Sequence, residues 1–187
     1  MRRWVAIVIA ALAFGAVSGV AAYQKVRLQG ESIDHAHWRE IAWPFSRDGW
    51  PAGRAFRCEE AACGGGEAVE LYLRPKIGFC NCDTGVADDD EVDRVADLDL
   101  ISANFAPLAP GSVVHIADMA GRTRLYELGM PDGSRHAAIG IAVSHRCDLL
   151  VAAAHGKAQA GELQRAALAF LSSGDMTHWM TAALGGR

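Results

Sequence analysis

The sequence has no cluster of lysine and arginine side chains, no internal repeat and no low-complexity tract. Its 187 residues include 18 Lys and Arg against 22 Asp and Glu, and the formal net charge is −4. Binding to the phosphate backbone of nucleic acid depends on concentrated positive charge, so we predict no nucleic-acid partner. The length is sufficient for one domain with a hydrophobic core.

Motifs of several common enzyme classes are missing as well. The sequence contains no Gly-x-Ser-x-Gly elbow of a serine hydrolase and no glycine-rich phosphate loop between a strand and a helix. The acidic run of residues 83–99 lacks the ordered ligands and the sixth-position glycine of an EF-hand loop. We therefore predict no catalytic residue and no cofactor, which favours a protein that is not an enzyme.

Charge is absent from residues 4–22, which follow a basic start at Arg2 and Arg3. Nineteen uncharged residues are enough to span a bilayer, and the two arginines favour a cytoplasmic N-terminus. We expect a membrane anchor in a bacterial-type inner membrane, with the rest of the chain on the periplasmic or extracytoplasmic side. The alternative is an export signal that is cleaved near Ala22, which would leave a periplasmic or secreted protein.

The remaining chain is predicted to form a juxtamembrane stalk over residues 23–39 and an α+β domain over residues 40–187. Val69, Leu71 and Leu73 alternate with polar residues, which is typical of a half-buried strand. The order of elements predicts an antiparallel sheet with helices packed on one face. Strands are expected over residues 54–58, 68–73, 113–116, 123–128, 137–144 and 148–154. A strand or helical turn is expected over 35–43, a loop over 104–111, and helices from 88, over 160–171 and over 175–185.

Part of this pattern resembles the PsbP-like and DcrB-like exported domains. Residues 43–50, WPFSRDGW, are similar to the aromatic, Pro-Asp-Gly-Trp-type opening of those families. The strand of residues 121–128 before a Pro-Asp-Gly hairpin, and the closing helix, follow in the same order over most of residues 40–173. The resemblance implies an exported α/β domain with an accessory role. It supplies no counterpart of a Cys-x-Cys motif.

Five cysteines in an exported chain predict disulfide bonds. Cys58 and Cys63 flank a predicted turn between two strands, so they are expected to lie within bridging distance. Cys147, which is predicted to lie in a strand near the centre of the sheet, could pair with either Cys80 or Cys82. One cysteine is left over in every such arrangement.

The Cys-x-Cys motif also permits a functional interpretation. Thiolates at Cys80 and Cys82 could perform thiol redox chemistry, or bind copper(I) with Cys147 or His145 as a third ligand. Zinc and iron–sulfur sites usually have a second matching cysteine pair, and none is present here. Copper is therefore the alternative cofactor.

Acidic residues are densest just after this motif, at Asp88, Asp89, Asp90, Glu91 and Asp93. An aspartate with a glutamate three residues later has the form of a capping box, and acids at a helix N-terminus interact favourably with the helix dipole. The alternative is a docking surface for a basic protein partner.

Together these patterns predict a membrane-anchored, disulfide-stapled exported protein with an accessory or binding role. Its partners would be the membrane, through residues 4–22, and another protein. The alternative function is a thiol-redox or copper-handling factor that uses Cys80 and Cys82.

Overall fold

The computed structural model describes residues 37–185 apart from 47, 60–62, 64–67 and 79–81. The predicted anchor, most of the predicted stalk and Cys80 lie outside the described residues. Chain contacts separate residues 1–36 from residues 37–187, and the described domain belongs to the second unit. Within the described part of the chain, no helix is both long enough and apolar enough to cross a membrane.

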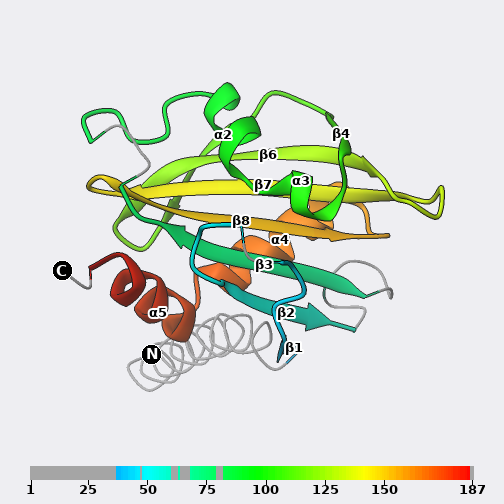
Figure 1. The fold of residues 1–187 in the computed structure, drawn as a ribbon, viewed down its shortest axis with the longest axis horizontal. Coiled ribbons are helices and arrows are strands. Elements are labelled where there is room, and N and C mark those ends of the chain that lie inside the picture. The colour runs from blue at the N-terminus through cyan, green and yellow to red at the C-terminus, as the bar shows by residue number, and fades with distance from the viewer. Residues whose placement is uncertain (1–36, 47, 60–62, 64–67, 79–81, 186–187) are drawn as a thin grey trace, which may run out of the picture. The chain divides into compact units, whose positions relative to one another are not determined.

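An eight-stranded antiparallel sheet forms the centre of this domain (Figure 1). The strand order is β1-β2-β3-β8-β7-β6-β4, and β5 pairs with the same edge of β6 as β4 does. Strand β6 is eleven residues long, so two short strands can share its edge. The strands are β1 (Trp38–Ile41), β2 (Arg54–Cys58), β3 (Val69–Lys76), β4 (Asn104–Pro107), β5 (Ser112–Ile116), β6 (Met119–Gly129), β7 (Arg135–His145) and β8 (Asp148–Gly156).

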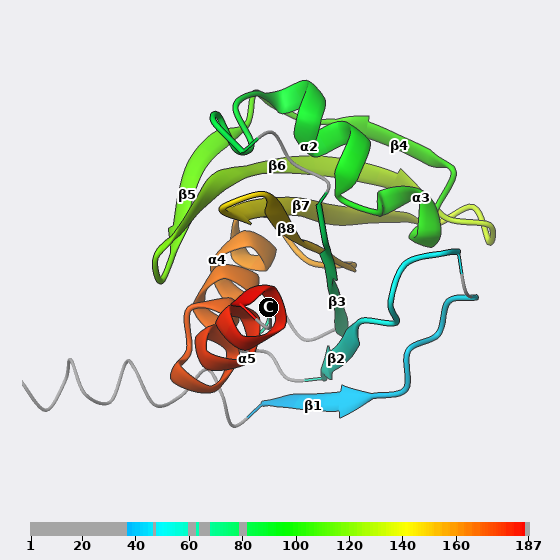
Figure 2. The same cartoon turned by 60° about the vertical axis from the view of Figure 1, so that its left-hand side comes forward.

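Helices cover both faces of the sheet, so the domain is α+β but the prediction of helices on one face is wrong (Figure 2). The central strands are apolar on both sides: Ile139 and Ile141 face one core, and Ala138 and Ala142 face the other. Each apolar face needs its own cover. The helices are α2 (Asp89–Val95) and α3 (Leu98–Ile101) on one face, and α4 (Ala160–Leu171) and α5 (Gly174–Gly185) on the other.

Strand β3 is also buried on both sides rather than half-buried. Val69, Leu71 and Leu73 belong to the core beneath α4 and α5, as the alternation predicted. Tyr72 and Arg74 point to the opposite face, yet they are only 6 % and 3 % exposed. The polar positions of this strand therefore lie in the interior, and their side chains need partners there.

Those partners come from a covering segment, residues 42–50 apart from 47, and from Asp97, which directly precedes α3. The Phe45 ring meets the Tyr72 ring edge-on, with the two centroids 4.7 Å apart. Arg74 donates through Nη2 to Asp48 at 2.7 Å and through Nε to Asp97 at 2.7 Å. The aromatic stretch noted in the sequence thus packs over β3, and a buried cation holds it there.

Two further local predictions are wrong. Residues 104–107 form strand β4 instead of belonging to a loop, because Pro107 at the end of an edge strand does not interrupt a ladder of hydrogen bonds. Cys147 lies in the turn between β7 and β8, next to Arg146 with its positive φ of 57°, and not in a strand near the sheet centre. The helix predicted over residues 160–171 is confirmed as α4.

Candidate functional site

The register of three central strands brings together a group of titratable side chains that are far apart in the sequence. Glu70 on β3 lies directly opposite His155 on β8, and His155 lies opposite Ala138 on β7. His136 is two residues from Ala138, so it points to the same face of the sheet. The three titratable side chains therefore share the face that α2 and α3 cover.

Glu70 is the most heavily hydrogen-bonded member of this group. It accepts from the Tyr72 hydroxyl and from Arg57, whose Nε lies 2.9 Å from Oε1. Its Oε2 also faces His155 Nε2 at 3.6 Å. The interaction with His155, and then those with Tyr72 and Arg57, outweigh the effect of burial and lower the pKa of Glu70 far below its usual range. Glu70 is therefore a carboxylate at any physiological pH.

His155 links this carboxylate to His136. Its Nδ1 lies 3.2 Å from Nδ1 of His136, and the two ring planes differ by 20°. The ring centroids are 5.4 Å apart. This is about the Nδ1–Nδ1 distance plus the distance from each nitrogen to the centre of its own ring, so the two nitrogens face each other head-on. Tyr72 stacks on His155 with its ring centroid 5.9 Å away. His155 itself is only 8 % exposed.

A pocket of about 330 Å³ opens beside the two imidazoles. Asp132 lines it from the turn between β6 and β7, where its Oδ1 accepts hydrogen bonds from the hydroxyl and the backbone N–H of Ser134. These bonds, with Lys157 and His136 nearby, lower the pKa of Asp132. The pocket is therefore polar and carries both signs of charge. Its lining is Ala68, Glu70, Asp132, His136, His155 and Lys157.

The cysteines predicted as site residues form disulfide bonds in the described part of the chain. Cys58 is joined to Cys63, with Cα atoms 6.1 Å apart, and Cys82 is joined to Cys147, with Cα atoms 4.3 Å apart. The structure thus selects Cys82 as the partner of Cys147. Cys80 lies outside the described residues. The first bridge is buried, whereas Cys82 and Cys147 are exposed.

The predicted copper ligands are not assembled as thiolates in this structure. Cys82 and Cys147 are bonded to each other, and His145 faces Asp118 with Nδ1 3.5 Å from Oδ2. Within the residues that the structure describes, no group of three or more His, Cys, Asp or Glu side chains is placed to hold a metal ion. Copper binding stays a prediction that depends on reduction of the bridge.

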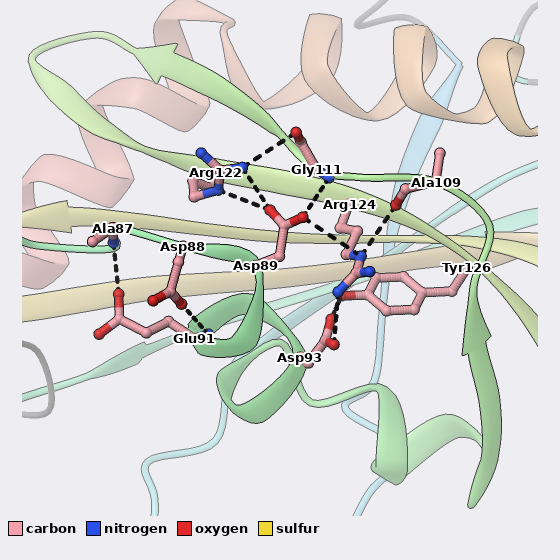
Figure 3. A network of polar contacts seen from close by, with 10 residues as sticks. All are labelled: Ala87, Asp88, Asp89, Glu91, Asp93, Ala109, Gly111, Arg122, Arg124 and Tyr126. Carbon is pink, nitrogen blue, oxygen red and sulfur yellow. Dashed lines mark hydrogen bonds and ion pairs between the residues drawn. The ribbon is translucent and has the colours of Figure 1, made fainter.

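Two of the five clustered acids face the sheet rather than solvent (Figure 3). Asp89 accepts from the backbone N–H of Gly111 at 2.8 Å and from Arg122 Nη2 at 2.6 Å. Asp93 accepts from Arg124 Nη1 at 2.8 Å and from the Tyr126 hydroxyl at 2.5 Å. These bonds tie α2 to β6, so Asp89 and Asp93 already have cationic partners within the domain.

The other acids serve the start of α2 or face outward. Asp88 caps the helix, as predicted, by accepting from the backbone N–H of Glu91 at 2.9 Å. Glu91 accepts from the backbone N–H of Ala87, one residue before the position that a regular capping box would use. Asp88 and Asp90 are exposed. Docking of a basic partner at this cluster stays a prediction. Asp89 and Asp93 are already bonded within the domain, so fewer carboxylates of the cluster remain to bind such a partner.

Glu70, His136 and His155 are not recognisable in the sequence as members of one group. No motif joins them, because they come from three strands whose pairing depends on the whole sheet. Glu70 alternates with the apolar residues of its strand, and this pattern predicts that its side chain faces solvent. In the structure that side of the strand is covered.

Comparison with known proteins gives no family for this chain. No family model matches it, and no curated protein matches it. One similar solved structure is a protein of unknown function, PA94 from Pseudomonas aeruginosa, described as a putative regulator. The two share 12 % identity at a TM-score of 0.38, over 69 % of this chain and 88 % of that one. So low a score supports no argument about function, and the resemblance to PsbP-like and DcrB-like domains stays a prediction.

Proposed function

We propose that this chain is an exported accessory protein, anchored in the membrane through residues 4–22, whose domain acts by binding. The observation that carries the proposal is the pair of disulfide bonds in a chain whose residues 4–22 carry no charge. Disulfides persist in oxidising compartments and are rare in reducing ones. The polar pocket beside Glu70 supports a binding role, because it offers several polar groups around a space of about 330 Å³.

Expression of the full chain with its own N-terminus in a Gram-negative host tests the proposal. The protein should resist carbonate extraction from membranes and become sensitive to protease when the outer membrane is opened. Leu12→Arg places a charge in the middle of the uncharged run, at a cost of about 3 kcal/mol for membrane insertion, and should release or mislocalise the chain. Leu28→Arg lies beyond the run and is the matched control.

Two results of that experiment would contradict parts of the proposal. A soluble form that begins at Tyr23 would show that the uncharged run is a cleaved export signal. If the domain stays protected from protease after the outer membrane is opened, and its cysteines are free, the domain lies in the cytoplasm. That result would remove the basis for an exported function.

A thiol-redox or copper-handling function is the second candidate, and one observation favours it. The Cys82–Cys147 bridge is exposed, so an external thiol can reach it. A redox role predicts a reduction potential well above the roughly −300 mV that bounds structural disulfides. Copper handling predicts that the reduced protein binds copper(I) and that Cys80→Ser weakens this binding. A reduction potential below roughly −300 mV, together with no copper(I) binding, would indicate that the bridge has a structural role.

A further inference from the structure

Three strands of the described sheet have an outer edge with no pairing strand among the described residues: β1 at one end, and β4 and β5 along β6 at the other. Such edges present unpaired backbone groups, and proteins protect them with charged side chains or proline. Strand β1 has exposed charges at Arg39 and Glu40, and β4 ends in Pro107. Strand β5, Ser-Val-Val-His-Ile, contains no proline and no Asp, Glu, Lys or Arg. It is therefore the least protected edge of the described sheet.

Exposed apolar side chains mark the same edge. Among the described residues, the large hydrophobic side chains that are exposed are those of Val113, at 64 %, and Leu108, at 53 %. Val113 is on β5, and Leu108 lies between β4 and β5, where its N–H donates to the carbonyl of Leu125 on β6. Figure 2 shows β5 at the outer rim of the sheet, beyond β6. An exposed valine in the middle of an unprotected edge strand favours pairing with a further strand.

The register of β5 shows which of its backbone groups face outward. Ile116 and Met119 are partners across the two-residue turn that joins β5 to β6, so these two residues exchange hydrogen bonds. Such bonding recurs at every second residue of an antiparallel ladder, and Val114 therefore also bonds to β6. The N–H and C=O groups of Val113 and His115 point away from β6, toward the free edge.

This edge is complementary to itself. If a two-fold axis passes beside Val114, Val113 of one copy lies opposite His115 of the other, and each of these two pairs forms two hydrogen bonds. Every outward N–H and C=O group of the two residues is then used. Val114 lies opposite its own counterpart, which gives a cross-strand pair of β-branched side chains. The two histidines do not face each other, so no like charges are opposed when they are protonated.

We propose that this chain forms a weak two-fold dimer in which β5 pairs with β5 of a second copy, so that the two sheets become continuous. The size of the contact limits its strength, because β5 supplies five residues and a stable interface has about 20–30 residues on each side. Confinement of both copies to one membrane raises their effective concentration and favours the dimer. This last step rests on the proposed membrane anchor, whereas the pairing itself does not.

Analytical ultracentrifugation of the detergent-solubilised full chain, over a series of concentrations, tests the dimer. We expect a monomer–dimer equilibrium that Val113→Lys weakens by about tenfold or more, because it places a charge on the edge. Val113→Pro should abolish the dimer and leave the fold intact, since it removes an N–H that β6 does not use. Thr181→Lys adds the same charge at an exposed position of α5 and is the matched control. A chain that stays monomeric at the highest concentration reached, or a dimer that survives both Val113 variants, would overturn the proposal.

Cysteine cross-linking tests the register and the identity of the occupant. In a Cys80→Ser background, Val114→Cys should form a disulfide between two copies, since Cα atoms in a non-hydrogen-bonded pair lie about 4.5 Å apart. His115→Cys lies opposite Val113 rather than its own counterpart and should cross-link much more slowly. Equal cross-linking at the two positions, or attachment of Val114→Cys in cells to a protein of another size, would exclude the second copy as the occupant. Leu12→Arg should dimerise in purified form as the unmodified chain does, so a failed localisation experiment would leave this result unaffected.

Discussion

The charge of Asp48 holds the covering segment against β3, and acid should therefore release it. The hydrogen bond from Arg74 is the main reason that the pKa of Asp48 falls from 3.8 to about 2. A group whose pKa is lower in the folded protein stabilises the fold above its unfolded value and loses that effect as the pH falls through its folded value. Asp48→Asn should therefore lower the Tm near neutral pH, and the difference from the unmodified protein should shrink below pH 3.8.

Thermal melts of the two proteins over a pH series measure this difference. Asp99→Asn, which changes an exposed aspartate on α3, serves as the control and should lower the Tm little at any pH. A difference between Asp48→Asn and the unmodified protein that stays constant down to pH 2 would show that the carboxylate acts through packing rather than through its charge.

Single residues whose role is local were predictable from the sequence. Asp88 caps α2, and Cys58 pairs with Cys63 across a short turn, because each role depends on residues nearby in the chain. Glu70 and His155 were not predictable, since 85 positions separate them and only the pairing of β3 with β8 places them opposite each other. Local chemistry is visible in a sequence, whereas strand register is a property of the whole sheet.

At the scale of elements, the close approach of α2 to the sheet depends on one glycine. A Cβ added at Gly140 on β7 would lie 2.8 Å from Cβ of Ala96 and 3.1 Å from Cε2 of Tyr126. Gly140→Ala should therefore push α2 away from β7 and cost about 1–3 kcal/mol in the free energy of unfolding. Chemical denaturation with urea measures this cost.

The same substitution at Gly161 is the matched control. Gly161 lies in the first turn of α4, and an added Cβ there meets nothing within 4 Å. Gly161→Ala should leave stability unchanged or raise it by about 0.4–1 kcal/mol, since alanine restricts the unfolded chain. Equal effects of the two variants would mean that the α2–β7 contact is loose enough to accept a methyl group.

An element whose own hydrophobic pattern has a helical or strand period was predicted correctly. An element whose conformation depends on pairing with a neighbouring strand was not. Leu163, Ala167 and Phe170 form an apolar stripe at helical spacing, and α4 has the predicted bounds. Strand β4 has no alternation of its own and contains Pro107. Its strand conformation comes from pairing with β6, which supplies the hydrogen bonds that the short segment cannot provide by itself.

For the molecule as a whole, the two disulfides should differ in their contribution to stability. The Cys58–Cys63 bridge spans 5 residues and Cys82–Cys147 spans 65. In the chain-entropy model these loops correspond to about 2 and about 4 kcal/mol. Cys82→Ser/Cys147→Ser should therefore lower the free energy of unfolding about twice as much as Cys58→Ser/Cys63→Ser, as measured by urea denaturation.

Peptide mapping under non-reducing conditions supplies the control for that comparison. Both bridges should be recovered from the unmodified protein and from Cys80→Ser. A Cys80–Cys147 bridge in the unmodified protein, or a larger loss of stability in the Cys58/Cys63 variant, would contradict the assigned pairing or its expected energetic order.

The α+β class of the molecule followed from the order of its elements, but the two-sided cover did not. The apolar runs in β7 and β8 are long enough to have suggested burial on both faces. What the sequence could not reveal is that a short acidic helix and an aromatic stretch before β2 cover the same face, and that a buried arginine of β3 holds the aromatic stretch there. The covering segments come from separate parts of the chain, so no hydrophobic periodicity in the sequence indicates that they meet.

The pairing of Cys82 with Cys147 has a consequence for how the chain becomes oxidised if it is exported as proposed. On that route the chain would pass a membrane pore from the N-terminus onward, so Cys58 and Cys63 would emerge almost together and could join at once. Cys82 emerges directly after Cys80, and its partner follows only after 65 more residues. During that interval the nearest available thiol is the wrong one. If the chain is exported, its correct oxidation in a living cell should therefore depend on a disulfide isomerase, whereas slow refolding of the completed chain in a glutathione buffer should not.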